Sequence, residues 1–196
     1  MTNYRRQSDP NQAGELFDEL LVVLAQRGDR RALERLYRRW SPRLLRAARR
    51  YCGDDDAASD LAQECWIGIW KGIQKSGGTL RDPSRFRSYA FSVLHRRGAD
   101  HLRVVIRQRD TAVPQPSEAA GYPPAQSESA AIAQAFAALP PDQRLAAHLH
   151  FVEGLTLREI AMVQSIPEGT AKSRLFHARR ALKAALTDNP KETNDD

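Results

Sequence analysis

Hydrophobic positions recur at helical spacing along most of this chain, and no stretch alternates in the manner of a β-strand. A first helix is predicted over 15–27. The Gly28-Asp29 pair ends it, and Asp29 caps the next helix. A further helix start is predicted at Ser41-Pro42, where the serine would be the N-cap and the proline the first helical residue. The pattern therefore predicts an all-α protein.

Glycines and aspartates mark the remaining helix boundaries of the first half. Gly53 and the three aspartates after it end one helix and start another, which ends at Gly77-Gly78. Asp82, followed by proline, opens a long helix that runs to about residue 109.

Composition divides the chain into two parts. Four prolines and few large apolar residues fall just before residue 130, a composition typical of a flexible linker. We therefore expect two small helical domains, at 15–108 and 130–187, joined by a flexible linker over 109–129. The tails at 1–14 and 188–196 are expected to be disordered.

The second domain carries the pattern of a helix-turn-helix. Thr156 and Glu159 have the spacing of a capping box, which starts a short helix. A turn near Ser165 separates that helix from a longer basic helix starting at Glu168. The apolar stripe of the longer helix consists of Ala171, Leu175, Ala178 and Leu182. Its opposite face and flanks carry Thr170, Lys172, Ser173, Arg174, Phe176, His177 and Arg180.

Small polar residues let a helix approach the major groove, and basic flanks reach the phosphates. We therefore interpret the second helix as a DNA-recognition helix. The alternative is a solvated cationic face on an ordinary core helix.

The helix predicted over 57–73 has an unusual outer face. Its inward stripe consists of Ala58, Leu61, Cys65 and Ile69. Its outer face consists of Asp60, Gln63, Glu64 and Ile67, with Trp70 at the edge. Apolar residues exposed among acids are typical of a protein-binding face. The alternative is that Trp70 belongs to the core.

Charge favours a polyanionic partner. The formal net charge is +6. Eight arginines lie between residues 81 and 109 against two aspartates, and five basic residues lie between 168 and 183 against one glutamate. Two separate basic segments predict two separate contacts with phosphate.

Other chemistry is weakly supported. Cys52 and Cys65 lack metal-site spacing, and we expect free thiols; a redox pair is the alternative. His148 and His150 point to different sides of a helix, so we expect no metal. Because no catalytic grouping or phosphate-cradling loop stands out, we expect no enzyme activity and no cofactor. Without a signal-peptide pattern or an apolar run of membrane length, a cytoplasmic protein is expected.

Three ordered motifs resemble a known family. Residues 60–70 (DLAQECWIGIW) are similar to the core-binding helix of bacterial sigma factors of the sigma-70 family. Residues 86–103 resemble the promoter-melting helix of that family, and 139–179 resemble its C-terminal promoter-reading domain. The resemblance covers about 15–104 and 130–186, and the two-domain layout is similar to the extracytoplasmic-function (ECF) group.

The resemblance implies roles for individual residues. Binding to the clamp helices of the RNA polymerase largest subunit would fall to Asp60, Leu61, Gln63, Glu64 and Ile67. Contact with the −10 element, including a pocket for a flipped base, would fall to Gly77, Gly78, Arg81, Tyr89, Arg96, Arg97, His101 and Arg103. Reading of the −35 element would fall to Thr170, Lys172, Ser173, Arg174, His177 and Arg180. The linker would thread toward the polymerase channels.

Aromatic stacking on an extruded base is worth roughly 1–3 kcal/mol and would help to offset the free energy of melting. Phe91 is expected in the core, whereas Tyr89 is left open between core and surface.

Three positions depart from the family pattern. Arg96 stands where asparagine is frequent, which puts base readout there in doubt. Ser165 stands where glycine is usual, at a cost if the turn requires a positive φ. Gln164 replaces an apolar residue and is expected to loosen packing under the turn.

The leading interpretation is an ECF sigma factor that is monomeric when free, with RNA polymerase core, promoter DNA and an anti-sigma factor as partners. The alternatives are a helix-turn-helix regulator of duplex DNA that is not a polymerase subunit, and an adaptor that does not bind DNA. A regulator normally needs a dimer and a palindromic site, and the outer face of 57–73 argues against it.

Overall fold

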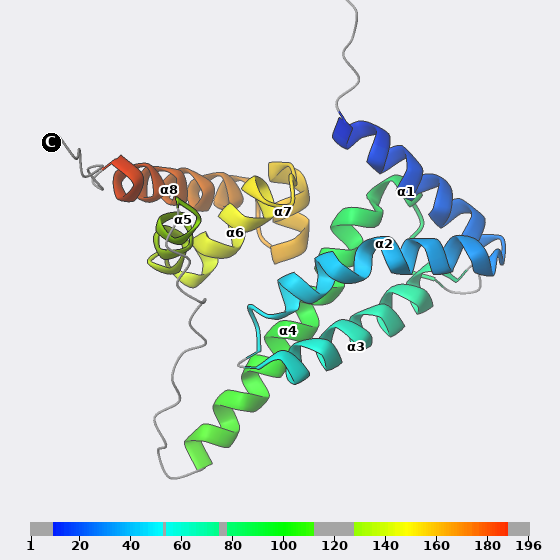
Figure 1. Ribbon diagram of the computed structural model, residues 1–196, viewed down its shortest axis with the longest axis horizontal. Helices are drawn as coiled ribbons and strands as arrows, with labels where there is room; N and C mark the ends of the chain where they lie inside the picture. The colour runs from blue at the N-terminus through cyan, green and yellow to red at the C-terminus, as the bar shows by residue number, and fades with distance from the viewer. Residues whose placement is uncertain (1–9, 53, 75–77, 112–127, 188–196) are drawn as a thin grey trace, which may run out of the picture. The chain divides into compact units, whose positions relative to one another are not determined.

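The computed structural model describes residues 10–52, 54–74, 78–111 and 128–187 (Figure 1). These residues form α-helices joined by short turns, with no strand among them. Contacts divide the chain into two units, Met1–Ser117 and Glu118–Asp196. None of the helices in the described ranges combines the length and apolarity needed to cross a bilayer.

The described residues of the first unit form four α-helices and one short 3-10 helix. The elements are α1 (Pro10–Gln26), α2 (Arg30–Ala48), α3 (Asp55–Ile73), η1 (Pro83–Arg85) and α4 (Phe86–Thr111). Its core is built on an aromatic cluster between α2 and α4. The Trp40 ring lies edge-on to Phe86 at 5.0 Å and to Phe91 at 6.0 Å. All three rings are at most 2% exposed, so the expected core position of Phe91 is confirmed.

The predicted helix start at Ser41-Pro42 is wrong, because α2 continues through this pair without a break. A proline inside a helix costs about 3 kcal/mol, since it removes one backbone hydrogen bond and crowds the preceding turn. The apolar stripe of α2 runs across the proline, with Leu36, Trp40 and Leu44 all fully buried. Burial of such side chains is worth about 1.5–3 kcal/mol each, which outweighs the local cost.

The start of α3 is as predicted, and its end matches the predicted range of 57–73, although not the predicted stop at Gly77-Gly78. The Asp54 side chain caps α3 by accepting a hydrogen bond from the Ala57 backbone N–H at 2.7 Å. The helix ends at Ile73, several residues before the predicted glycine pair, of which Gly77 lies outside the described residues. The chain then turns back, and the Leu80 N–H donates to the Gly72 carbonyl at 2.9 Å.

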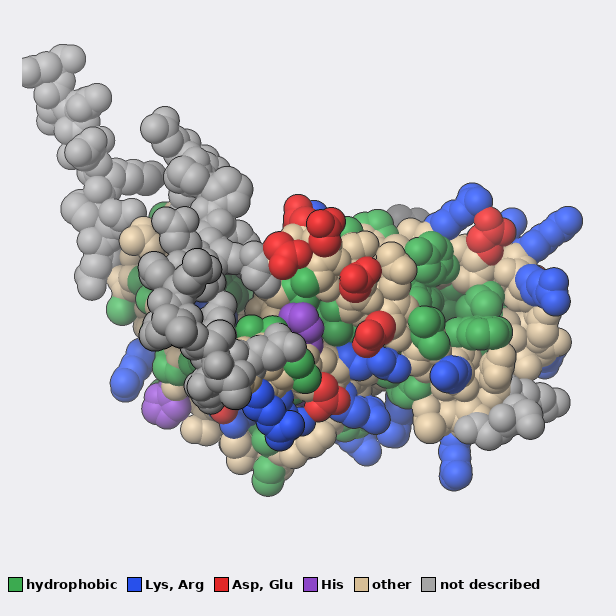
Figure 2. Space-filling view, turned by 90° about the horizontal axis from the view of Figure 1, so that it is seen from below, with side chains coloured by type: hydrophobic (Ala, Val, Ile, Leu, Met, Phe, Trp, Pro, Cys, Tyr) green, Lys and Arg blue, Asp and Glu red, His purple; other side chains and the backbone are tan. Residues whose placement is uncertain are grey.

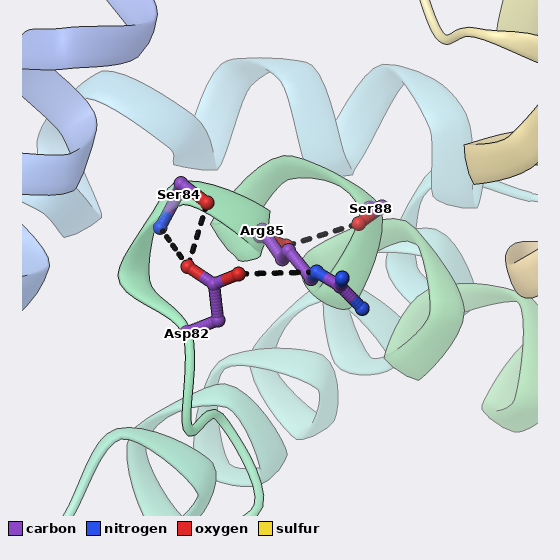
Figure 3. A network of polar contacts seen from close by, with 4 residues as sticks. All are labelled: Asp82, Ser84, Arg85 and Ser88. Carbon is purple, nitrogen blue, oxygen red and sulfur yellow. Dashed lines mark hydrogen bonds and ion pairs between the residues drawn. The ribbon is translucent and has the colours of Figure 1, made fainter.

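Asp82 organises the start of the long helix, as predicted (Figure 3). Its Oδ1 accepts hydrogen bonds from the backbone and hydroxyl of Ser84, at 3.1 and 2.6 Å. Its Oδ2 lies 3.1 Å from Nε of Arg85. The hydrogen bond from the Ser84 hydroxyl is the main reason that the pKa of Asp82 lies below its ordinary value. The first turn is the 3-10 helix η1, and regular α4 follows from Phe86.

The second unit consists of α5 (Glu128–Ala137), α6 (Pro141–Phe151), α7 (Leu157–Gln164) and α8 (Glu168–Thr187). Helix α8 packs against the other three. One core cluster consists of Ala135, Leu139, Ala147, Ala178 and Leu182. Small residues dominate this cluster, so the helices approach closely.

The predicted helix-turn-helix is confirmed in detail. Thr156 and Glu159 form both halves of the capping box at the start of α7. Ser165 ends α7 with φ 53° and ψ 46°, the left-handed conformation that glycine adopts most easily. The expected steric cost of serine at this turn is therefore present.

Candidate nucleic-acid and protein interfaces

The outer face of α3 is exposed as the sequence predicted. Asp60, Gln63 and Glu64 are exposed, and Ile67 and Trp70 remain 50% and 47% accessible. Trp70 is therefore not a core residue. Figure 2, which views the molecule from the side of α3, shows acidic side chains next to a hydrophobic patch. A surface of this composition suits a protein partner better than water alone.

Leu61 needs a correction. It is 4% exposed and lies with Ala58, Cys65 and Ile69 on the inward stripe of α3. A side chain in this position cannot contact a partner unless the unit rearranges. Leu61 therefore supports the outer face from beneath, in contrast to the direct contact that the resemblance implied.

An ion pair joins this outer face to α4. Nη1 of Arg97 lies 3.1 Å from Oε2 of Glu64, and the side chains are 36% and 62% exposed. Gly68 permits the close approach, because a Cβ there would lie 3.1 Å from Val93 and 3.3 Å from Arg97. The residue predicted to contact the −10 strand and the residue predicted to contact polymerase are thus in direct contact.

The predicted −10 residues on α4 and the preceding loop have mixed environments. Tyr89 is half-buried, and its hydroxyl shares a hydrogen bond with Oγ1 of Thr79 at 2.8 Å. This position lies between the core and surface alternatives. The backbone beneath it is Gly72, where an added Cβ would collide with the Tyr89 hydroxyl.

The cationic residues of this surface differ in their partners. Arg81 and Arg96 are exposed, and neither has an acidic partner in the described ranges. Arg103 lies 2.6 Å from Asp100 one turn earlier, in an exposed pair that contributes little free energy. His101 is half-buried, Gly78 lies at the start of the loop, and Gly77 falls outside the described residues.

The outer face of α8 is exposed at five of the six predicted positions. These are Thr170, Lys172, Ser173, His177 and Arg180. The opposite stripe is buried as predicted. Phe176 is 61% exposed and its ring lies 5.5 Å from that of His177.

Arg174 is the exception on α8. Its Nη1 donates to Oε1 of Gln164 at 2.6 Å, and its Nη2 lies 2.6 Å from Oδ2 of Asp142. The Arg174 side chain is only 25% exposed. It therefore ties α8 to α7 and to the start of α6, which limits its freedom to reach DNA.

This network also explains Gln164, which stands where an apolar residue was expected. Its side chain is 8% exposed, and Oε1 is bonded to Arg174. The expected loosening under the turn is thus replaced by a specific polar contact. Nε2 of Gln164 is buried and has no hydrogen-bond partner among the described residues.

The two cysteines are buried, and His148 and His150 each lie close to an oxygen atom of the protein. Cys52 and Cys65 are buried free thiols, and burial raises the pKa of Cys65 to about 12, so this thiol stays neutral. Nε2 of His148 lies 3.2 Å from Oε1 of Glu153, while Nδ1 of His150 lies 2.9 Å from the Leu155 carbonyl. No cluster of three potential metal ligands occurs within the described ranges.

One basic surface was missed by the sequence analysis. Nine arginines and no lysine lie in residues 30–50, against Glu34 as the single acid. This local excess of arginine is visible in the composition of the segment. Five of these arginines, four on α2 and one at its C-cap, lie opposite the buried stripe of the helix.

Comparison with known families accounts for both units. Residues 36–107 match the model for sigma-70 region 2, and residues 129–182 match the model for sigma-70 region 4. The chain is 30% identical over 186 residues to RNA polymerase sigma-H factor of Pseudomonas aeruginosa, covering 86% of this chain and 93% of that protein. It is 24% identical over 183 residues to ECF RNA polymerase sigma-E factor of Escherichia coli, covering 86% and 93% of the two chains.

Solved structures show the same fold. CnrH, solved in complex with the cytosolic domain of CnrY, aligns with a TM-score of 0.62 at 22% identity and covers 89% of this chain and 99% of that one. The sigma factor RpoE, solved with the anti-sigma factor NepR from Bartonella quintana, aligns with a TM-score of 0.61 at 23% identity, covering 80% and 98%. A regulator with only a helix-turn-helix would not match region 2. The chain therefore belongs to the sigma-70 family of RNA polymerase sigma factors, within its ECF group, and directs the initiation of transcription.

Proposed function

We propose that this sigma factor binds RNA polymerase core through the outer face of α3, with Asp60, Gln63, Glu64 and Ile67 in contact and Leu61 beneath them. The observation that carries the proposal is the exposure of Ile67 and Trp70 on the same face as Asp60 and Glu64. Exposed apolar side chains gain free energy when a partner covers them, and the acids favour a basic partner surface.

The −10 element would be bound by the surface that adjoins this face. Arg81, Arg96, Arg97 and Arg103 supply positive charge there, and His101 lies among them. Tyr89 supplies an aromatic edge beside the loop that carries Gly77 and Gly78. A positive surface attracts the phosphate backbone, and a base extruded from the duplex gains stacking on an aromatic ring.

The −35 element would be read by α8. Ser173 and His177 occupy the centre of the exposed face, and Thr170 lies near its N-terminal end. Lys172 and Arg180 lie where they can reach phosphates on the flanks. Arg174 would act mainly by holding α8 in position.

The remaining features follow the same proposal. The predicted domain bounds of 15–108 and 130–187 are too narrow, because α1 begins at Pro10, α4 ends at Thr111 and α5 begins at Glu128. The domains would therefore extend over 10–111 and 128–187, and the linker between them would thread toward the polymerase channels. The protein would be cytoplasmic, monomeric when free and without catalytic activity of its own.

An anti-sigma factor is proposed as a further partner, covering the α3 face and the second unit when transcription is off. Complexes of RpoE with NepR and of CnrH with CnrY support this idea for structurally similar proteins. Recovery of the tagged protein from cells without a stoichiometric second protein other than polymerase would contradict it.

Run-off transcription with purified core polymerase and a library of promoter fragments tests the central proposal. The control replaces Asp60 and Gln63 with alanine, both of which are exposed. We expect specific initiation that requires the chain and weakens in the double variant. Duplex binding without any initiation would contradict a role as a polymerase subunit.

A further inference from the structure

Helix α2 and its C-cap residue carry an arginine stripe, defined as Arg31, Arg35, Arg38, Arg46 and the C-cap Arg49. All five side chains are exposed. At 3.6 residues per turn they fall within about 80° of one another around the helix axis. They lie opposite the buried stripe of Leu36, Trp40 and Leu44.

The stripe is incompletely neutralised inside the protein. Arg38 pairs with Glu34 and Arg49 pairs with Asp55, at 2.6 and 2.7 Å. Arg31, Arg35 and Arg46 have no acidic partner within the described ranges. Both pairs that do form are exposed, and such pairs contribute little and exchange partners easily.

This arrangement works against the stability of α2. Like charges three or four residues apart destabilise a helix, and α2 already contains Pro42. A helix face that is merely solvated normally mixes acids with bases. An external polyanion would offset the repulsion that the fold itself leaves in place.

The geometry suits the backbone of nucleic acid. Arg31 to Arg49 spans about 27 Å along the axis. Members three or four residues apart lie about 5–6 Å from each other, and about 12 Å separates Arg38 from Arg46. The stripe is made entirely of arginine, whose planar guanidinium binds phosphate through two parallel hydrogen bonds. It lacks small polar residues that would read bases, so it fits a sequence-independent contact.

We propose that the arginine stripe binds the phosphate backbone of the duplex DNA that flanks the −10 element. Helix α2 packs directly against α3 and α4, so the stripe belongs to the same unit as the proposed −10 surface (Figure 1). The inference rests on the proposed function for the location of the DNA, but it adds a contact made by α2.

The test measures promoter binding by the holoenzyme, formed with saturating core polymerase, between 0.05 and 0.2 M salt. The variant replaces Arg35 and Arg46, which are exposed, with alanine. Each phosphate contact contributes about 0.9 to the slope of log K against log salt, so the slope falls by about 1.8. Wild-type binding consequently weakens roughly tenfold more than variant binding across this salt range.

Three controls separate the outcomes. Replacing Arg27 and Arg30 with alanine removes the same charge outside the stripe and leaves the slope unchanged. Replacing Arg35 and Arg46 with lysine retains most of the slope. The Arg35/Arg46 alanine variant loses equal affinity for promoters with altered −35 sequences, because phosphates carry no sequence information.

Two results would overturn the inference. One is an unchanged slope in the Arg35/Arg46 alanine variant while wild-type holoenzyme still initiates specifically, which leaves the proposed function intact. The other is a loss of affinity for core polymerase in a direct titration, which assigns the stripe to an acidic protein surface. Failure of wild-type initiation on every promoter would instead contradict the proposed function.

Discussion

Helices α3 and α8 are of nearly equal length, 19 and 20 residues, and each buries one stripe of small and branched apolar residues in its own unit. Their outer faces differ completely. The α3 face combines acids with Ile67 and Trp70, whereas the α8 face carries small polar and cationic side chains around His177. The buried stripes pack each helix against the core of its own unit. The outward faces distinguish a protein partner from a nucleic-acid partner.

The largest effect is expected when a charge is placed in the apolar part of the α3 face, because this directly tests whether that face binds a protein. We expect Ile67→Asp to weaken binding to core polymerase by about 30-fold or more, because loss of a central apolar anchor typically costs 2 kcal/mol or more. Thermal stability should change little, since Ile67 is 50% exposed. Titration of core polymerase with labelled protein measures the affinity.

Leu16→Asp is the matched control, because Leu16 on α1 is a 63% exposed apolar residue outside the α3 face. It should bind core as the wild type does. Equal weakening by both substitutions would indicate a nonspecific effect of added negative charge, and no weakening by Ile67→Asp would remove α3 from the interface.

The second prediction distinguishes residues of α8 that contact bases from residues that hold the helix in position. His177→Ala should change the preferred base at one −35 position, by about five- to hundredfold in relative affinity, because direct base contacts are worth about 1–3 kcal/mol. Arg174→Gln should weaken binding to all −35 sequences alike, since its guanidinium is held by Gln164 and Asp142. Binding to a randomised −35 library measures both effects.

Asp142→Asn is the informative control for Arg174. It removes the same ion pair from the α6 side and leaves the outer face of α8 unchanged. Similar base profiles for Arg174→Gln and Asp142→Asn would support a positioning role. A changed base preference in Arg174→Gln alone would show that Arg174 reads DNA directly.

The third prediction concerns the link between α3 and the −10 surface. Gly72→Ala should lower the free energy of unfolding by about 1–3 kcal/mol, because its Cβ would collide with the Tyr89 hydroxyl and disturb the contact with Thr79. Chemical denaturation measures the change. Gly169→Ala is the opposite case, since nothing lies within 4 Å of its Cβ, and a gain of up to about 1 kcal/mol is expected.

The sequence predicted those parts of the fold that depend on local chemistry. The cap at Asp82, the capping box at Thr156 and the two inward stripes require only spacing and hydrogen-bonding type. The continuity of α2 through Pro42 was not predictable in this way, because it depends on the burial of Trp40 against residues of α4.

In the candidate site, too, features that depend on local sequence could be predicted and features that depend on tertiary contacts could not. Exposure of Ile67 could be predicted from helical periodicity, which left Trp70 open between the surface and the core. The ion pair of Arg174 with Asp142 could not be predicted from the sequence, because the two residues lie 32 positions apart. Leu61 illustrates a different limit: a motif carries residues that support an interface together with residues that form it, and only burial separates the two.

The smallest expected effect tests how strongly the turn before α8 determines the presentation of its outer face. Ser165→Gly removes the steric cost of a left-handed serine, where φ is 53°, and should stabilise the second unit by about 0.5–1 kcal/mol. Differential scanning calorimetry of the full chain should show this unit melting a few degrees higher. Ser173→Gly, inside α8, should shift the same transition downward, because glycine has a low helix propensity. If Ser165→Gly stabilises the unit without changing −35 affinity, α8 is already held in its binding orientation by Arg174. Weaker DNA binding in the stabilised variant would instead mean that the strained serine contributes to that orientation.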